Sequence, residues 1–95
     1  MNTKDKKSMN AMGYACKYGH TEVVKALLAF KAKINAGTGT ERMPPLSWAA
    51  AYGHYGLCEE LLNNKGRVLS KDKYKRTPLM MAVRNGHTKI ASLLL

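Results

Sequence analysis

Apolar and polar positions follow one pattern that occurs three times along the chain. The segments MGYACKYGHTEVVKALL, LSWAAAYGHYGLCEELL and LMMAVRNGHTKIASLLL agree in character throughout. Each has an apolar position, two variable sites, a pair of small residues, two more variable sites, Gly-His and an apolar run. The Gly-His pairs start at Gly19, Gly53 and Gly86, at intervals of 34 and 33 residues. A period in this range indicates an array of structural repeats.

Each copy predicts two short helices separated by a turn at Gly-His. In the third copy, Thr77 can cap a helix through its hydroxyl, and Pro78 suits the first helical position, where an N–H has no intrahelical partner. Gly86 suits the left-handed residue that ends this helix. A second helix follows, carried by TKIASLLL. Helices this short are marginal alone, so each hairpin needs neighbours that bury its apolar side.

The first helix of the third copy also predicts which residues pack inward. The residues predicted to face the core are Leu79, Ala82 and Val83. The residues predicted to face other surfaces are Met81, Arg84 and Asn85.

Three segments in register carry a resemblance to a known family. RTPLMMAVRNGH, GHTEVVKALL and PPLSWAAAYGH resemble the ankyrin repeat, and the resemblance covers essentially the whole chain. It implies an all-α solenoid of stacked helix-turn-helix units with β-hairpin-like finger loops. The fingers and first helices would line a concave face, and the second helices would form the convex back. The implied repeats are approximately 5–37, 38–71 and 72–95, the third being truncated.

Departures from the family pattern predict local differences. Lys31 and Lys65 stand where the family has a glycine after the second helix. Either these lysines adopt a left-handed conformation, or the helix end shifts by one residue, as Gly66 would allow. The second finger, AGTGTERM, has one extra residue and two glycines, so we expect it to be longer and more mobile. Pro44 occupies the position of the family's capping threonine.

The two ends of the chain carry no polar cap. The chain opens on MNTKD, like the start of a finger, and closes on SLLL before a second helix would normally finish. Terminal repeats generally need a polar outer face. We therefore expect an excerpt of a longer array, in which four apolar residues are partly uncovered: Ile90, Leu93, Leu94 and Leu95.

The 95 residues are enough for one small domain. A domain of this size buries a smaller fraction of its surface on folding than a larger domain does, so every apolar face matters for its stability. No apolar run approaches the ~18 residues of a membrane span, and MNTKDKKSMN lacks the apolar core of a signal peptide. We therefore expect a protein inside the cell, in the cytoplasm rather than the nucleus. Cys16 and Cys58 fall in predicted helices without a CxxC pairing, which favours small buried residues in a reducing compartment.

Positive charge dominates the composition and concentrates in or beside the predicted fingers. Sixteen Lys and Arg against six Asp and Glu give a formal net charge of +10. The residues of this cluster are Lys4, Lys6, Lys7, Arg42, Lys71, Lys73, Lys75 and Arg76. The cluster fits a solvated face that keeps the protein soluble, and it equally fits attraction to an acidic protein segment.

The three histidines invite a metal or acid–base interpretation, which the repeat geometry disfavours. Equivalent positions in stacked helices lie ~8–10 Å apart, whereas zinc ligands bring their donor atoms within about 4 Å of one another. No nucleophile or carboxylate recurs beside them, so a general base is not predicted either. We predict structural roles at the turns and at the third helix start for Gly19, His20, Gly53, His54, Thr77, Pro78, Gly86 and His87.

Aromatic side chains recur near the Gly-His turns. Trp48 aligns with Tyr14 and Met81, a position where packing between first helices is favoured over ligand stacking. By the resemblance, the variable sites just before Gly-His face the concave groove, together with the fingers. The candidate partner-binding residues are Lys6, Lys7, Lys17, Tyr18, Arg42, Tyr52, Lys73, Tyr74, Arg76 and Arg84.

Nothing in the sequence predicts catalysis. It has no phosphate loop, metal cluster, paired carboxylates or nucleophile arrangement, so we predict no enzyme, cofactor, metal or small-molecule substrate. The resemblance implies a protein-interaction scaffold. Two alternatives stay open: direct binding of nucleic acid or an anionic membrane surface through the basic fingers, and a passive spacer within a larger multidomain protein.

Overall fold

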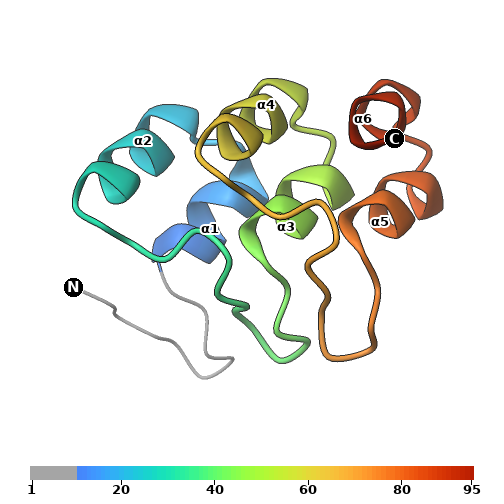
Figure 1. Ribbon diagram of the computed structural model, residues 1–95, viewed down its shortest axis with the longest axis horizontal. Helices are drawn as coiled ribbons and strands as arrows, with labels where there is room; N and C mark the ends of the chain where they lie inside the picture. Colours follow the sequence, from blue (N-terminus) through green and yellow to red (C-terminus); the bar gives the residue numbers. More distant parts are fainter. Residues whose placement is uncertain (1–10) are drawn as a thin grey trace.

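Pairs of antiparallel helices follow one another in a computed structural model, which describes residues 11–95 (Figure 1). Six helices and no extended strand occur in this range. They are α1 (Ala11–Tyr18), α2 (Thr21–Ala29), α3 (Pro45–Ala51), α4 (Tyr55–Asn63), α5 (Pro78–Arg84) and α6 (Thr88–Leu94). The predicted all-α solenoid of stacked helix-turn-helix units is confirmed.

The helices form two layers. The first helices α1, α3 and α5 lie side by side, and α3 packs against both of its neighbours. The second helices form the other layer, in which α4 packs against α2 and α6. The loops before α3 and α5 extend beyond the first layer as fingers (Figure 1). Buried side chains such as Leu46, Leu57 and Leu61 fill the space between the layers.

A histidine links each of the second and third Gly-His turns to the repeat before it. Gly19 and Gly53 have φ of 73° and 80°. Nε2 of His54 lies 2.9 Å from the carbonyl oxygen of Lys17, and Nε2 of His87 lies 3.0 Å from that of Ala51. Both carbonyls belong to the last turn of a first helix, where a carbonyl lacks an intrahelical partner. The imidazole N–H therefore caps the first helix of the preceding repeat.

The second helices end at a left-handed lysine. Lys31 and Lys65 have φ of 66° and 72°. At the first of these ends, the N–H of Lys31 bonds the carbonyl of Leu28 at 2.9 Å, and the residue after it bonds Leu27 at 2.9 Å. The end of α4 has the same pair of bonds, so both ends are Schellman motifs. The alternative of a helix end shifted to Gly66 is wrong.

The predicted inward side of α5 is partly wrong. Ala82 is fully buried as predicted, but Val83 is 64% exposed, and Met81 is only 6% exposed. Cys16 and Ala50 occupy the register of Val83 in α1 and α3, and both are fully buried. Each of those helices has a later first helix packed against it. Since α5 is the last of the three, the same side of it lacks that cover.

The predicted exposure of the last helix is also partly wrong. Ile90 and Leu94 are 2% and 5% exposed, because α6 packs its apolar side on α4 and α5. Leu93 is half-buried, and only Leu95, at 90%, is largely exposed.

The second finger is a tight hairpin held at its base. Thr38 and Met43 exchange two backbone hydrogen bonds of 3.0 Å. A Cβ on Gly37 would lie 2.2 Å from the carbonyl oxygen of Arg42, so only glycine fits there. Pro44 stands at the N-cap of α3, and its side chain makes no capping bond. Thr77, at the equivalent place before α5, accepts a bond from the N–H of Met80 at 3.3 Å.

Replacing turn glycines by alanine will separate backbone strain from the histidine contact. A Cβ on Gly53 would lie 2.8 Å from Cε1 of His87, whereas a Cβ on Gly86, with φ 74°, would meet nothing within 4 Å. We expect Gly53→Ala to lower the free energy of unfolding by about 1 kcal/mol or more, and Gly86→Ala to lower it by less.

The matched control is Gly56, which lies inside α4 with open space around it. Gly56→Ala should raise the free energy of unfolding by about 0.5–1 kcal/mol, because alanine is the better helix former. Urea titrations followed by circular dichroism measure all three variants. A Gly53→Ala protein as stable as the parent would contradict both the backbone strain at Gly53 and its close contact with His87.

Candidate partner-binding groove

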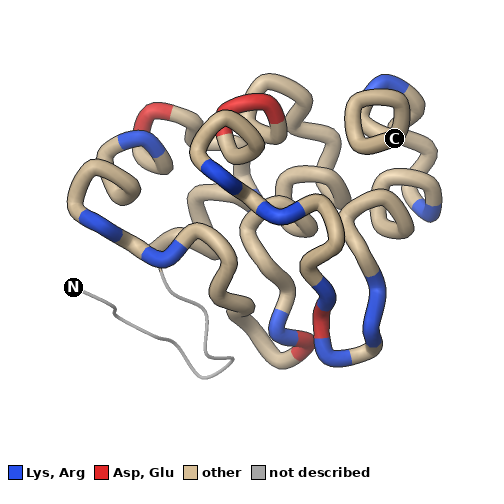
Figure 2. The backbone as a smooth tube through the Cα atoms, in the orientation of Figure 1, with Lys and Arg blue, Asp and Glu red and all other residues tan. Residues whose placement is uncertain are grey.

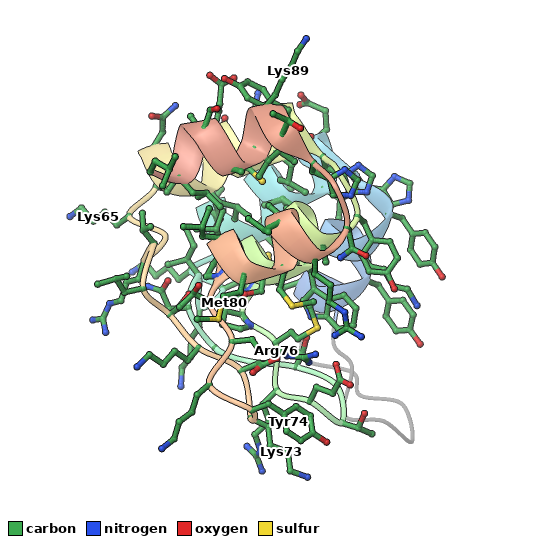
Figure 3. The ribbon with its side chains drawn as sticks, turned by 90° about the vertical axis from the view of Figure 1, so that its right-hand side faces the viewer. Lys65, Lys73, Tyr74, Arg76, Met80 and Lys89 are labelled. Carbon is green, nitrogen blue, oxygen red and sulfur yellow. The ribbon has the colours of Figure 1, made fainter. Side chains whose placement is uncertain are left out.

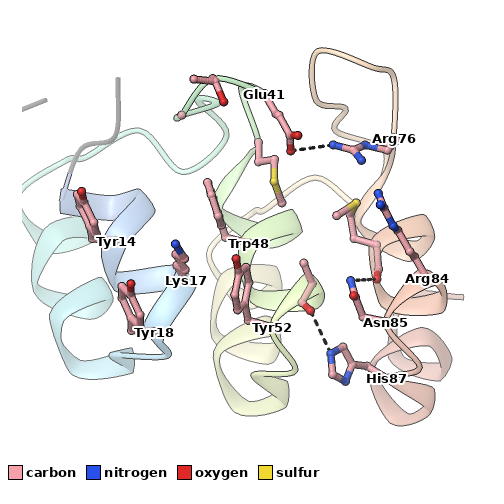
Figure 4. Close-up of a pocket in the computed structure, with 15 residues that line it drawn as sticks. Tyr14, Lys17, Tyr18, Glu41, Trp48, Tyr52, Arg76, Arg84, Asn85 and His87 are labelled. Carbon is pink, nitrogen blue, oxygen red and sulfur yellow. Dashed lines mark hydrogen bonds and ion pairs between the residues drawn. The ribbon is translucent and has the colours of Figure 1, made fainter. Parts of the chain in front are cut away.

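The first helices and the second finger enclose an open groove of about 1080 Å³ (Figure 4). It is lined by Tyr14, Lys17, Tyr18, Gly39, Thr40, Glu41, Met43, Trp48, Ala51, Tyr52, Arg76, Met81, Arg84, Asn85 and His87. The lining comes from all three repeats, because the last turns of α1, α3 and α5 stand in a row.

Three aromatic rings surround one ammonium group on this surface. Nζ of Lys17 lies 5.4 Å from the ring centroid of Tyr18, 5.9 Å from that of Trp48 and 5.7 Å from that of Tyr52. These distances are within the range of cation–π attraction. Within residues 11–95 no carboxylate forms an ion pair with Lys17. The rings hold the charge in place without neutralising it.

Trp48 serves both packing and the groove. Its ring is half-buried and packs with Met43, Ala51 and Met81 at the base of the second finger. Its Nε1–H donates to Oγ1 of Thr38 at 3.1 Å, which fixes the ring plane. The other part of the ring lines the groove. The sequence therefore identified the packing role but not the exposed part.

An ion-pair network joins the second and third fingers. Nε of Arg76 donates to Oδ2 of Asp72 at 2.7 Å. Its Nη2 donates to Oε1 of Glu41 at 2.9 Å, a bond that Figure 4 shows. Oδ1 of Asp72 accepts the N–H groups of Tyr74 and Arg76 at 2.8 and 2.9 Å. The N–H of Lys73 also donates to the carbonyl of Glu41 at 2.7 Å. The two fingers are thus one connected unit, which we call the finger clamp.

The clamp shifts the titration of its two central groups. Burial by itself raises the pKa of Asp72, but hydrogen bonds from Arg76 and Tyr74 and the charge of Arg76 lower it by more, so the pKa lies below its ordinary value of 3.8. The hydrogen bond with Asp72, followed by the charges of Asp72 and Glu41, raises the pKa of Arg76 despite some desolvation. The pair remains ionised at neutral pH.

The sequence-predicted binding residues fall into three groups. Those that line the groove are Lys17, Tyr18, Tyr52, Arg76 and Arg84. Those exposed on the fingers outside it are Arg42, Lys73 and Tyr74. Lys6 and Lys7 lie outside the described residues.

The sequence did not predict that Tyr14 and Glu41 contribute to the groove, nor that the guanidinium of Arg76 is already paired. The four-residue spacing of Asp72 and Arg76 was the available signal.

Within the described residues, the titratable side chains gather into no metal site, and the two cysteines are buried. Within residues 11–95 no three His, Cys, Asp or Glu side chains gather closely enough to hold a metal ion. Burial raises the pKa of Cys16 and Cys58 to about 12, and at Cys16 the neighbouring Cys58 adds to this. Thiols with so high a pKa are protonated at neutral pH and are poor nucleophiles.

Comparisons with known proteins agree with the repeat architecture. A family model described as ankyrin repeats, in three copies, matches residues 1–72 and 35–95. The chain is 35% identical over 95 residues to human transient receptor potential cation channel subfamily A member 1, covering 97% of this chain and 8% of that protein. No helix in the described part of this chain is long and apolar enough to cross a bilayer.

Two further proteins are similar to this chain. Mouse ankyrin repeat domain-containing protein 63 is 33% identical over 91 residues, covering 92% of this chain and 23% of that protein. A probable E3 ubiquitin-protein ligase XBOS32 of Oryza sativa subsp. japonica is 26% identical over 125 residues, covering 25% of its length. The chain thus spans a quarter or less of each of these relatives.

The finger clamp predicts a specific pH dependence of stability. Because the pKa of Asp72 is lowered by folding, its contribution is fully present above about pH 4 and is lost as the pH falls through the folded pKa. We expect Asp72→Ala to lower the free energy of unfolding by about 1–3 kcal/mol at neutral pH. Asp72→Asn should cost less, because its amide oxygen can still accept the two N–H groups.

Urea titrations between neutral pH and about pH 3 measure this dependence. The difference between the parent and Asp72→Asn should shrink as the pH falls, because Asp72 of the unfolded parent binds a proton near pH 4, whereas the folded carboxylate binds one only at lower pH. A difference that stays constant with pH would show that the charge of Asp72 contributes nothing.

Proposed function

Because the chain belongs to the ankyrin repeat family, we propose that it is a scaffold that binds an acidic segment of a partner protein in its concave groove. Ankyrin repeats are generally protein–protein interaction modules and are generally non-catalytic. The proposal that the partner segment is acidic rests on the charges of the groove.

One observation carries this proposal: the groove holds cations that no carboxylate of residues 11–95 compensates. Lys17 lies among three rings without an ion pair, and Arg84 is exposed on the same surface. Among the described residues of the lining, the one carboxylate is that of Glu41, which is already bound to Arg76. A carboxylate from a partner would therefore meet unpaired positive charge beside aromatic area, which favours an acidic residue next to an apolar one.

The fingers and the groove would contribute differently to binding. Arg42 and Lys73 are exposed finger cations, and charges of this kind act mainly on the rate of association. Tyr52 is 49% exposed and stands at the middle of the groove, where a partner would remove it from water. Aromatic anchors at such central sites carry much of the affinity and act on dissociation.

Selection from a library of random peptides displayed on phage tests the proposal without a known partner. We expect the selected peptides to be enriched in Asp and Glu and to contain an apolar or aromatic residue beside them. Lys17→Gln with Arg84→Gln should weaken a selected peptide about tenfold or more, because two desolvated charge contacts are lost. Tyr52→Ala should mainly speed its dissociation.

The matched control removes two charges elsewhere. Lys25→Gln with Lys89→Gln changes exposed residues of α2 and α6 and should leave peptide affinity unchanged. Selected peptides without acidic residues, or equal loss of affinity in both double variants, would refute the acidic-partner proposal. Circular dichroism should be helical for every variant.

A further inference from the structure

A second charged surface lies along the loops that follow the second helices. Its cations are Lys31 and Lys33 after α2, and Lys65, Arg67 and Lys71 after α4, and all five are exposed. Figure 2 shows them as a row that crosses the loops of the first two repeats. In Figure 3, Lys65 projects away from the body of the molecule. We call this row the basic edge.

The backbone beneath the basic edge is held in a defined arrangement. Lys31 and Lys65 occupy equivalent left-handed positions, so they leave their helices in the same direction. Oδ1 of Asn35 accepts the N–H of Arg67 at 2.9 Å, and its Nδ2 donates to the carbonyl of Lys65 at 3.4 Å. One amide side chain thereby ties the two loops together. The cations therefore stand side by side on a connected support.

No acidic side chain neutralises this row within the described residues. The carboxylates of Glu22, Glu59 and Glu60 belong to α2 and α4, and those of Glu41 and Asp72 belong to the finger clamp. The only ion pairs within residues 11–95 involve Lys25 and Arg76. The negative ends of α2 and α4 offset the lysines that follow them only in part. The basic edge therefore presents several uncompensated positive charges together.

An exposed aromatic ring accompanies these charges. Phe30, the C-cap residue of α2, is 89% exposed and directly precedes Lys31. The equivalent residue after α4 is Asn64, whose side chain bonds the carbonyl and carboxylate of Glu60 at 2.8 and 2.9 Å. A helix end of this type therefore does not require an aromatic residue at its C-cap. Phe30 gains almost nothing from packing and instead offers an apolar ring to solvent.

We propose that the basic edge binds the surface of a membrane rich in anionic lipids, with Phe30 entering the headgroup region. Clusters of four to eight Lys and Arg bind such surfaces electrostatically, and one inserted apolar side chain adds a second contribution. Single-stranded nucleic acid would instead require several stacking rings in succession. Phe30 is the one aromatic residue in segments 30–36 and 64–71, which carry the five cations of the basic edge.

The basic edge is separate from the groove. The groove's variable sites end the first helices, next to the Gly-His turns, and each second helix then runs back in the opposite direction. Its end, and the lysine after it, therefore lie at the other end of the helix pair. The molecule can hold a membrane surface at the basic edge while the groove is open to a protein, so this inference does not depend on the proposed partner.

Vesicle co-sedimentation of the full chain tests the inference. The vesicles are phosphatidylcholine alone and phosphatidylcholine with phosphatidylserine, each across a salt series. We expect binding to the anionic vesicles only, and we expect it to weaken as salt rises. Lys33→Gln with Arg67→Gln should weaken it by about tenfold or more. Phe30→Ser leaves the charge unchanged and should weaken it about three- to tenfold.

The controls distinguish binding through the basic edge from attraction by the net positive charge of the whole protein. Lys25→Gln with Lys89→Gln removes the same charge from the second helices and should bind as the parent does, and so should the groove variant Tyr52→Ala. Equal loss in both double variants, equal binding to neutral vesicles, or an unaffected Phe30→Ser would each overturn the proposal. Binding of a DNA duplex by a protein that leaves anionic vesicles unbound would assign the edge to nucleic acid instead.

Discussion

The contact between a histidine ring and the glycine of the preceding repeat sets the spacing of the array. A Cβ on Gly19 would lie 2.6 Å from Nδ1 of His54, so the ring occupies space that only glycine leaves open. The same ring donates to the last turn of α1. Glycine therefore provides both the left-handed turn and the close approach, and the stacking of α1, α3 and α5 follows from repeating this contact.

The fingers depend on a different kind of interaction. A small array has limited apolar surface, and the finger loops contribute little of it. They are instead joined by the carboxylate of Asp72, which is buried yet fully hydrogen-bonded, and by Arg76, which reaches across to Glu41. A buried charge is tolerated only when it is paired in this way. The clamp thereby gives the groove a rigid wall.

Charge is segregated over the molecule, and this separates its two surfaces. The described carboxylates lie on the second helices or within the finger clamp, which leaves the groove and the basic edge positive. The groove combines Lys17 with aromatic rings from α1 and α3, a surface suited to a shaped partner. The basic edge combines exposed cations with Phe30, a surface suited to an extended anionic one.

The sequence alone determined the repeats, the helix pairs, the turns and the chemical types present, because these depend on local backbone preferences that recur with a fixed period. It also identified the groove positions Lys17, Tyr18 and Tyr52, since the repeat register carries them. Only the tertiary structure decided that Val83 is exposed and Ile90 buried. Burial at those sites depends on which neighbouring helix is present, and the periodic pattern is the same whether a repeat lies inside the array or at its edge.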